Sequence, residues 1–327
     1  MITIDFENDL VSQESPVVLS ICIPFYECHA AQLMNELIRQ AEDCSSTTEI
    51  LLLDDGSRSV RYINSLKDSI IVTKKTKIKI FRSDINIGRA AARNILAQRS
   101  AGTHLLFIDS DMLPDADDFL VKYITHIRPD ERDVVLGGRS YKRIDWRSSK
   151  AIDKQLYLFY SSSTECLSAE LRSRHPERYL FTNNIMVSRS VFQEIPMDEG
   201  FSGWGYEDID WGIRLRSKAV TIVHIDNTAT HRGIICDNEL LVKYYSSVNN
   251  FLRLIKKHPD SSRSLPIVRA SQNTTWLGPL LLAIGKFACK SVILNKHAPL
   301  RIRMVGLQGF KVCLYSRAIY RLRHNAN

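Results

Sequence analysis

The sequence predicts an α/β protein with a mostly parallel central sheet, followed by a basic helical C-terminal extension. Three observations predict it: β-rich runs alternate with helical segments, polar residues follow the strand ends, and the excess positive charge lies near the C-terminus. Strands that alternate with helices indicate crossover units, which place helices on both faces of a parallel sheet. In such sheets ligands bind beyond the carboxyl ends of the strands.

The expected elements follow one another in a regular order. The sequence predicts a strand at 17–23 that stops at Pro24, a helix at 30–42, strands at 49–53 and 77–81 with a further helix between them, a helix at 89–99 and a strand at 104–108. Residues 141–180 are polar and irregular, as in an insertion over a site. The unit 181–192, a strand at 220–226 and a helical segment from about 237 complete the order.

The charge is unevenly distributed along the 327 residues. Residues 261–327 contain eleven Lys and Arg and no acidic residue, whereas residues 1–260 carry 33 basic and 36 acidic residues. The net charge of +8 therefore belongs to the C-terminal segment. The seven cysteines are scattered without a CxxC pair, which fits thiols in a reducing compartment. The acidic N-terminus lacks the pattern of a signal peptide, so we expect a cytoplasmic protein.

Two carboxylates follow the apolar run of 104–108. Asp109 and Asp111 are two residues apart, so in an extended chain both would point to the same side. Like charges so close repel each other unless a cation, typically divalent, lies between them. The alternative is an ordinary polar turn.

Seven short motifs occur in an order that resembles family 2 glycosyltransferases of the GT-A fold. The later half resembles the galactosyl- and N-acetylgalactosaminyltransferase-like branch, including chondroitin polymerase-type domains. The motifs are PFY at 24–26, DDGS at 54–57, NIGRAAARN at 86–94, DSD at 109–111, NN at 183–184, GWGYEDID at 203–210 and His231. The resemblance covers roughly residues 17–235. It implies a catalytic domain at 1–236, with a nucleotide-binding half at 17–112 and an acceptor half at 113–236, followed by a helical region at 237–327.

The resemblance implies a UDP-sugar donor and names residues for its nucleotide. Asp55 corresponds to the aspartate that bonds the uracil, although 54–57 could also serve only as a turn. Pro24, Phe25 and Tyr26 resemble the lip that packs on the nucleotide, with Tyr26 where many members have Asn. Arg93 matches a basic residue near the nucleotide, although an ordinary surface arginine fits the position as well.

A divalent cation is the implied cofactor. Asp111 corresponds to a direct ligand, Asp109 to a residue that contacts the ribose or a metal-bound water, and His231 to a third ligand. A lone histidine is more often structural, but this one follows a strand in register with the family. One imidazole with carboxylate and phosphate oxygens suits Mn²⁺, and Mg²⁺ less specifically.

The GWGYEDID segment is the implied source of the catalytic base. Asp208 corresponds to the base that takes the proton of the acceptor hydroxyl, and Glu207 to a residue that positions the acceptor. Acidic residues in a first helical turn also complement the helix dipole, which is the alternative. We expect Asp210 to face solvent or an arginine such as Arg214. A single displacement would invert the anomeric configuration.

Three further residues are assigned to the acceptor or the transferred sugar. Trp204 offers an apolar face between Gly203 and Gly205, which allow tight turns beside a ligand. The resemblance also assigns Asn183 and Asn184 to this role.

The basic C-terminal segment predicts a contact with lipid. The apolar stretch 276–294 is interrupted by Lys286 and Lys290 and limited by Pro279, so it is interpreted as an interfacial helix and not as a membrane span. We expect residues 261–327 to bind an anionic membrane surface, on its inner face. The alternative is a helical subdomain that packs on the catalytic domain. No nucleic-acid partner is expected.

The motifs together predict an inverting, metal-dependent transfer of a hexose or N-acetylhexosamine from a UDP-sugar to a glycan or lipid-linked acceptor in polysaccharide biosynthesis. One alternative is a sugar-nucleotide pyrophosphorylase, which lacks support because no Gly-rich triphosphate loop lies near the N-terminus. The other is a catalytically silent, membrane-associated glycan-binding or scaffold module.

Overall fold

The structure is a computed structural model, and it describes residues 1–8, 16–71, 73, 76–128, 132–144 and 154–324. The chain divides into two compact units. The sheet unit comprises Met1–Ile144, Glu165–Gly200 and Trp211–Gly233, and the helical unit comprises Asp145–Thr164, Phe201–Asp210 and Ile234–Asn327. Part of the predicted insertion, residues 145–153, lies outside the described residues.

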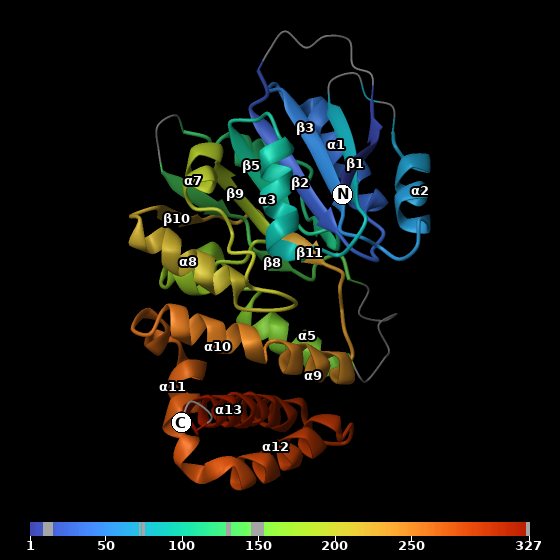
Figure 1. The fold of residues 1–327 in the computed structure, drawn as a ribbon. Helices are drawn as coiled ribbons and strands as arrows, with labels where there is room; N and C mark the ends of the chain where they lie inside the picture. Colours follow the sequence, from blue (N-terminus) through green and yellow to red (C-terminus); the bar gives the residue numbers. More distant parts are fainter. Residues whose placement is uncertain (9–15, 72, 74–75, 129–131, 145–153, 325–327) are drawn as a thin grey trace. The chain divides into compact units, whose positions relative to one another are not determined.

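An eight-stranded mixed sheet forms the centre of the sheet unit, in the order β1-β4-β3-β2-β5-β9-β7-β10 (Figure 1). Its strands are β1 (Ile2–Glu7), β2 (Leu19–Phe25), β3 (Thr48–Asp54), β4 (Lys77–Ser83), β5 (His104–Ile108), β7 (Asp133–Leu136), β9 (Asn184–Ser188) and β10 (Thr221–His224). The four neighbours β4, β3, β2 and β5 are parallel, as are β7 and β10. Strands β1 and β9 run antiparallel to their neighbours. The predicted α/β fold with a largely parallel sheet is confirmed.

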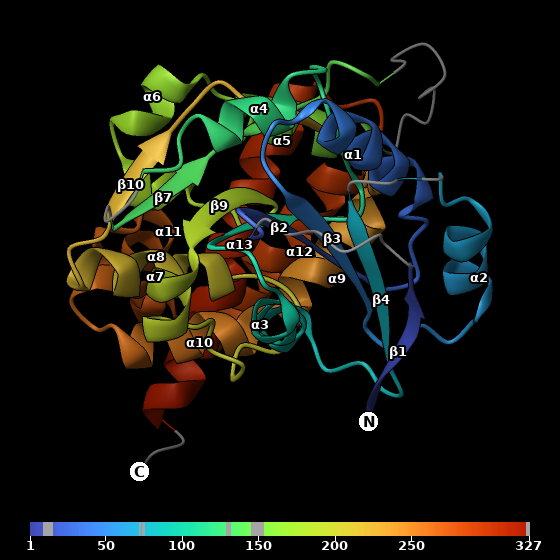
Figure 2. The same cartoon turned by 90° about the horizontal axis from the view of Figure 1, so that it is seen from above.

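Helices cover both faces of this sheet (Figure 2). One face carries α1 (Ala31–Asp43), α2 (Arg61–Asp68) and α4 (Phe119–Ile124), and the other carries α3 (Arg89–Arg99) and α7 (Arg189–Glu194). Successive strand residues point to opposite faces. Within β3, Ile50 and Leu52 therefore belong to one hydrophobic cluster, while Leu51 and Leu53 belong to the other.

The expected and observed elements differ in two instructive places. Helix α3 and strand β5 have the predicted bounds, but β2 continues through Pro24 to Phe25. Proline is tolerated there because the ladder between β2 and β5 ends at Cys22, so the missing N–H costs no bond on that side. Strand β1 was not predicted. It is an edge strand whose residues are half-buried or exposed, so it lacks a strong apolar signal.

A second, three-stranded sheet forms beside the end of β5, from β6 (Met112–Pro114), β11 (Ala229–His231) and β8 (Arg139–Ser140). The carboxylate of Asp115 holds it together by accepting hydrogen bonds from Thr230 Oγ1 at 2.6 Å and from Ser140 Oγ and Thr228 Oγ1 at 2.5 Å each. The register places His231 opposite Met112, the residue after Asp111. The segments around Asp111 and His231, more than 100 residues apart in the sequence, are thereby fixed next to each other.

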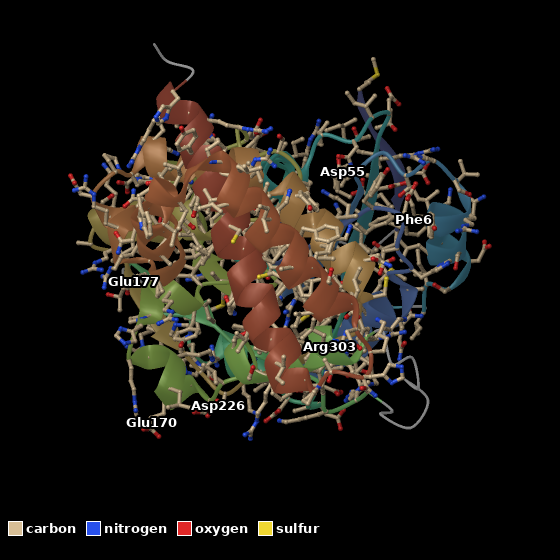
Figure 3. All side chains as sticks on the ribbon, turned by 90° about the horizontal axis from the view of Figure 1, so that it is seen from below. Phe6, Asp55, Glu170, Glu177, Asp226 and Arg303 are labelled. Carbon is tan, nitrogen blue, oxygen red and sulfur yellow. The ribbon has the colours of Figure 1, made fainter. Side chains whose placement is uncertain are left out.

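The helical unit confirms the predicted helical C-terminal extension. Its helices are α5 (Gln155–Thr164), α9 (Asp237–Ser246), α10 (Val248–Lys257), α11 (Pro266–Asn273), α12 (Gly278–Leu294) and α13 (Leu300–His324), with short 3₁₀ turns η2 (Ser261–Ser264) and η3 (Thr275–Leu277). Its apolar core includes Leu240, Phe251, Phe310 and Tyr315. Arg303, labelled on α13 in Figure 3, is fully buried, donates to Ile293 O at 2.8 Å and pairs with Asp237.

The stretch Pro266–Leu294 has the length and composition of a membrane span, with a mean hydropathy of 1.7 over its most apolar window, of which 11% is buried. By hydropathy alone, Lys286 and Lys290 therefore do not exclude a membrane span. A single segment of this kind is weak evidence for a span, because core helices and interfacial helices share its composition.

Candidate active site

The loops after β2 and β3 are joined by hydrogen bonds. Asp54 Oδ1 accepts from Ser57 N at 2.9 Å, which closes the predicted turn over residues 54–57. Ser57 Oγ in turn accepts from Glu27 N at 2.8 Å, and Asp55 N donates to Phe25 O at 2.8 Å. The carboxyl ends of these two parallel strands therefore form one fixed edge.

Asp55, labelled in Figure 3, ties this edge to the loop before α3. Its carboxylate accepts from Ile87 N at 2.7 Å and from Gly88 N at 3.1 Å. Burial raises the pKa of Asp55, and these two backbone donors act in the opposite direction. Gly56 has φ +74°, and a Cβ there would lie 2.3 Å from the carbonyl carbon of Ile85, so the loops meet too closely for a side chain. Asp55 thus has a structural role, and its carboxylate oxygens retain lone pairs for a further donor.

The three residues of the PFY motif separate into core and surface. Phe25 is 3% exposed and belongs to the sheet unit's core, so its ring packs within the fold and we do not retain it in the nucleotide lip. Pro24 is half-buried and Tyr26 is exposed. Alternation along β2 explains this outcome, because neighbouring residues of a strand point to opposite faces.

Arg93 is buried on α3 and not a surface arginine. It donates to the carboxylate of Asp109 through Nη2 and to Arg89 O at 3.2 Å through Nη1. Asp109 remains partly exposed, with 26% of its side chain accessible. The ion pair joins α3 to the end of β5 and orients the first carboxylate of the DSD motif.

The DSD motif is a turn and not an extended segment. Met112 N donates to Asp109 O at 2.9 Å across Ser110 and Asp111, so the expectation that both carboxylates share one side of a strand is wrong. The two aspartates have different partners. Asp109 pairs with Arg93, whereas Asp111 Oδ2 lies 3.2 Å from His231 Nε2.

The environment of Asp111 strongly favours its ionised form. Burial alone would raise its pKa, but the hydrogen bond and charge of His231, with the charges of Arg139 and Arg89, lower the pKa to about 2. The backbone supports this geometry, since Arg232 N donates to Asp111 O at 2.8 Å.

These residues fit the requirements of a divalent cation. Asp111 Oδ1 is buried and has no hydrogen-bond partner among the described residues. The backbone of Gly233 packs closely against both side chains, because a Cβ there would clash at 2.2 Å from Asp111 Oδ2 and 3.0 Å from His231 Nε2. The described residues contain no group of three or more His, Cys, Asp or Glu side chains that could hold a metal. A cation here would need further oxygen ligands, such as those of a diphosphate or water.

The two asparagines of the NN motif differ in exposure. Asn184 is buried: its Nδ2 donates to Gly138 O at 2.8 Å and to Asn227 O at 3.0 Å, and its Oδ1 accepts from Tyr123 Oη at 2.7 Å. Its amide serves the fold, and we do not retain it as an acceptor residue. Asn183 is half-buried, and its carbonyl accepts from Asp109 N at 3.2 Å.

The GWGYED segment belongs to the helical unit and has unusual backbone conformations. Gly203, Gly205 and Tyr206 have φ values of +76°, +92° and +74°. Asn250 on α10 stabilises this loop, because its Nδ2 donates to Ser202 O and Gly205 O at 2.9 Å each.

Two aromatic residues of this loop pack on the helices. Trp204 packs edge-on against Tyr244, with 5.3 Å between the ring centroids, and it is half-buried. Tyr206 packs against Phe251 and Tyr315. The loop conformation therefore depends on helices that follow it by some 40 to 110 residues.

Helix α8 (Glu207–Ser217) begins with the acidic residues of this motif. Glu207 is buried and Asp208 is half-buried. Asp210 is fully buried and lies 2.7 Å from Lys257 Nζ and 2.8 Å from His258 Nε2, so the expectation that it faces solvent is wrong. The start of α8 is thereby anchored to the end of α10.

Asp115 and Asn250 were not identified from the sequence. Asp115 comes two residues after the strand residue Leu113, and its partners Thr228 and Thr230 lie two residues apart, just before and within the distant strand β11. Such alternation of hydroxyl residues could have indicated a buried polar ladder. Asn250 lies in a helix without any local motif, so only the fold reveals its role.

Comparisons with known proteins agree with this arrangement. The family model described as glycosyl transferase family 2 matches residues 20–195, and the model described as the N-terminal domain of galactosyltransferase matches residues 163–235. An uncharacterized glycosyltransferase of Bacillus subtilis is 26% identical over 247 residues, which is 62% of this chain and 61% of the relative. The chondroitin synthase of Pasteurella multocida is 25% identical over 204 residues, 54% of this chain and 21% of the synthase.

The chain spans less than two thirds of the length of these relatives. Among solved structures, a Pyrobaculum calidifontis mannosyltransferase in complex with GDP-Man and Mn²⁺ has a TM-score of 0.52 at 13% identity, over 94% of this chain and 89% of that one, and it shows a shared fold. The expected order of motifs, the GT-A architecture and a family model that covers more than half of the chain lead to one conclusion. The chain belongs to glycosyltransferase family 2.

Proposed function

We propose that this protein transfers a hexose or N-acetylhexosamine from a UDP-sugar to a glycan or lipid-linked acceptor in polysaccharide biosynthesis, with inversion at the anomeric carbon. The observation that carries the proposal is the convergence of Asp111 and His231 beside Gly233, in a chain of this family. Membership of a glycosyltransferase family favours this function over a pyrophosphorylase or a silent glycan-binding module.

In this proposal the sheet unit binds the donor. Asp55 accepts a hydrogen bond from the uracil with carboxylate lone pairs that the N–H groups of Ile87 and Gly88 do not use. The exposed ring of Tyr26, close to Pro24 in the sequence, packs on the nucleotide. Arg93 acts indirectly. It orients Asp109, whose accessible carboxylate contacts the ribose or a metal-bound water.

Asp111 and His231 would hold Mn²⁺ or Mg²⁺, together with oxygens of the diphosphate. Such an ion supplies Lewis-acid stabilisation of the negative charge on the departing UDP. Asp111 is ionised at neutral pH, as an aspartate of ordinary or lowered pKa is, so it can offer a carboxylate to the ion. The buried Oδ1 of Asp111, which has no hydrogen-bond partner in the described part of the chain, is the oxygen that would gain most from a cation.

Asp208 would act as the general base for the acceptor hydroxyl. Asp208 lies on the first turn of α8, which fixes the direction of its carboxylate. Its side chain is half-buried, so it remains accessible to solvent. Glu207 and Asn183 would position the acceptor, and Trp204 would offer its ring to a sugar face. Removal of the hydroxyl proton as the oxygen attacks C1 gives a single displacement, and hence inversion.

We also propose a cytoplasmic protein that binds the inner membrane surface through residues 261–327. This segment contains eleven basic residues and no acidic residue, which supports an anionic partner.

The direct test is a panel of nucleotide sugars incubated with the purified full chain and Mn²⁺, with release of UDP as the readout. We expect one or a few UDP-sugars to be hydrolysed or transferred, EDTA to abolish the reaction and Mn²⁺ to restore it. Asp111→Asn should lose at least about 100-fold in rate, because an ion at a developing charge contributes several kcal/mol. Asp117→Asn, at an exposed carboxylate, is the matched control. Full activity in EDTA would refute the metal assignment, and no turnover of any nucleotide sugar would refute the enzyme.

A further inference from the structure

Helix α12 and the turn before it expose a row of large apolar side chains. Trp276, Leu280, Ile284 and Phe287 are exposed by 80%, 72%, 57% and 73%. The positions 280, 284 and 287 are spaced by four and three residues, so they share one face of the helix. A soluble monomer rarely leaves such a contiguous row uncovered.

The opposite face of α12 is already used within the helical unit. Close contacts with α13 run along Gly285, Cys289 and Val292, and a Cβ on Gly309 would lie 2.8 Å from Cys289 Sγ. These positions repeat by four and three residues as well, about half a turn away from the exposed row. The exposed row is therefore not needed for packing against α13, and the hairpin has a second apolar face.

Charge identifies the partner that this face would accept. Residues 261–327 contain no acidic side chain, and Lys290 on α12 and Arg301 on α13 add positive charge to the hairpin. A second copy docked through the same face would bring like charges together. An anionic lipid surface offers both hydrocarbon for the apolar row and negative headgroups for the cations. Trp276, the first residue of the row, has the amphipathic ring that favours the headgroup level.

We propose that the face formed by Trp276, Leu280, Ile284 and Phe287 inserts into one leaflet of an anionic bilayer, with α13 behind it. The inference sharpens the membrane contact in the proposed function by naming the inserting residues, and it does not depend on the chemistry of sugar transfer. It also differs from a membrane span. One face of α12 enters the leaflet while the other stays packed on α13.

The test uses the full chain, because Phe310 and Tyr315 of α13 belong to the unit's core and a truncation would remove them. Binding is measured by flotation with vesicles of phosphatidylcholine, with and without phosphatidylglycerol. We expect binding only to the anionic vesicles. Ile284→Asp and Phe287→Asp should each weaken it about tenfold or more, since each loses the burial of a large apolar side chain. Val242→Asp, at an exposed position on α9, is the matched control and should bind like the wild type.

Three results would overturn the proposal. Equal binding of the Phe287→Asp and Val242→Asp variants would show that the row does not insert. Resistance of wild-type binding to alkaline carbonate would indicate a spanning segment. A dimer that Phe287→Asp dissociates, without vesicle binding by the wild type, would identify a second copy as the partner. The rate of UDP release by the Phe287→Asp variant in solution should equal that of the wild type. This measurement separates membrane insertion from the proposed activity.

Discussion

The residues assigned to the donor and the residues assigned to the base are held in different ways. In the sheet unit, Asp55 and Asp111 follow strands of the central sheet and are fixed largely by backbone groups of neighbouring loops. In the helical unit, the loop that leads to Asp208 is fixed by side chains of later helices, above all Asn250. Strand ends place the first set, and tertiary packing places the second.

This difference separates two kinds of substitution. A change in the sheet unit should alter donor affinity, whereas a change in the helical unit should alter turnover with the acceptor and leave donor affinity intact.

The largest effect is expected from Asp208→Asn. The amide keeps the size of the side chain and removes its basicity, so only the transition state loses its proton acceptor. We expect kcat to fall about 10²- to 10⁴-fold with little change in the Kd for UDP, measured by single-turnover kinetics and calorimetry. Glu207→Gln should raise the KM for the acceptor more than that for the donor. Transfer by Asp208→Asn at nearly the wild-type rate would leave Asp208 as a helix-start residue only.

Arg93→Gln should have the next largest effect, and on the donor side. The substitution leaves Asp109 without its buried charged partner, at a cost of about 1–3 kcal/mol for the lost charge-assisted bond. We expect UDP affinity to fall about 10- to 100-fold, with a smaller change in acceptor KM at saturating donor. Arg99→Gln, in the last turn of the same helix, is the control. A pure loss of kcat at unchanged UDP affinity would contradict the proposed role of Asp109.

Asp210→Asn and Asn250→Ala test the support of the base segment. Asp210 is the buried partner of Lys257 and His258, and Asn250 holds two carbonyls of the glycine-rich loop. Each substitution should lower the free energy of unfolding of the helical unit by about 1–3 kcal/mol and reduce kcat.

UDP affinity distinguishes a local effect from general unfolding. It should stay within about twofold of the wild type in both variants at a temperature where they remain folded, as circular dichroism would verify. A parallel loss of UDP affinity would show that the two units do not respond separately.

Much of the fold follows from local patterns in the sequence. The bounds of α3 and β5 were predictable because an alanine-rich helix and a continuous apolar strand give strong signals. The antiparallel direction of β9 was not, since strand direction depends on the path of the chain and not on composition. Strand β1 was not predictable either, because an edge strand with one half-buried face has the same pattern as a polar terminus.

The candidate site, too, depends on long-range contacts that local patterns do not predict. Asp111 and His231 were named together from motif order, and the structure brings them to 3.2 Å. Phe25, Asn184 and Asp210 also lie in motifs, yet they are buried and serve the fold. Motif membership identifies a segment, but the contacts that each side chain makes within the fold decide which of them remain candidates. Those contacts result from long-range pairing that a single sequence does not reveal.

A buried cluster in the sheet unit offers a test of stability without effect on chemistry. Arg172, on α6 (Ala169–Ser173), donates to Ile225 O at 2.8 Å and to His224 Nδ1 at 2.7 Å. His224 Nε2 then donates to Pro176 O at 3.1 Å, which assigns its single proton to Nε2. Burial, followed by the charge of Arg172, lowers the pKa of His224 to about 4, against the raising effect of Pro176 O.

The effect expected to matter least for activity is a loss of stability in mild acid. The unfolded chain binds a proton at His224 near pH 6.5, whereas the folded chain resists protonation until about pH 4. Since the unfolded state binds more protons in this window, the free energy of unfolding should fall as the pH decreases from about 6.5 to 4, by at most about 1.4 kcal/mol per pH unit from this residue. His224→Gln keeps one acceptor and one donor, so denaturant unfolding of this variant should show a shallower pH dependence. The exposed His297→Gln variant should keep the wild-type slope, and an unchanged slope in His224→Gln would mean that His224 is protonated equally in both states.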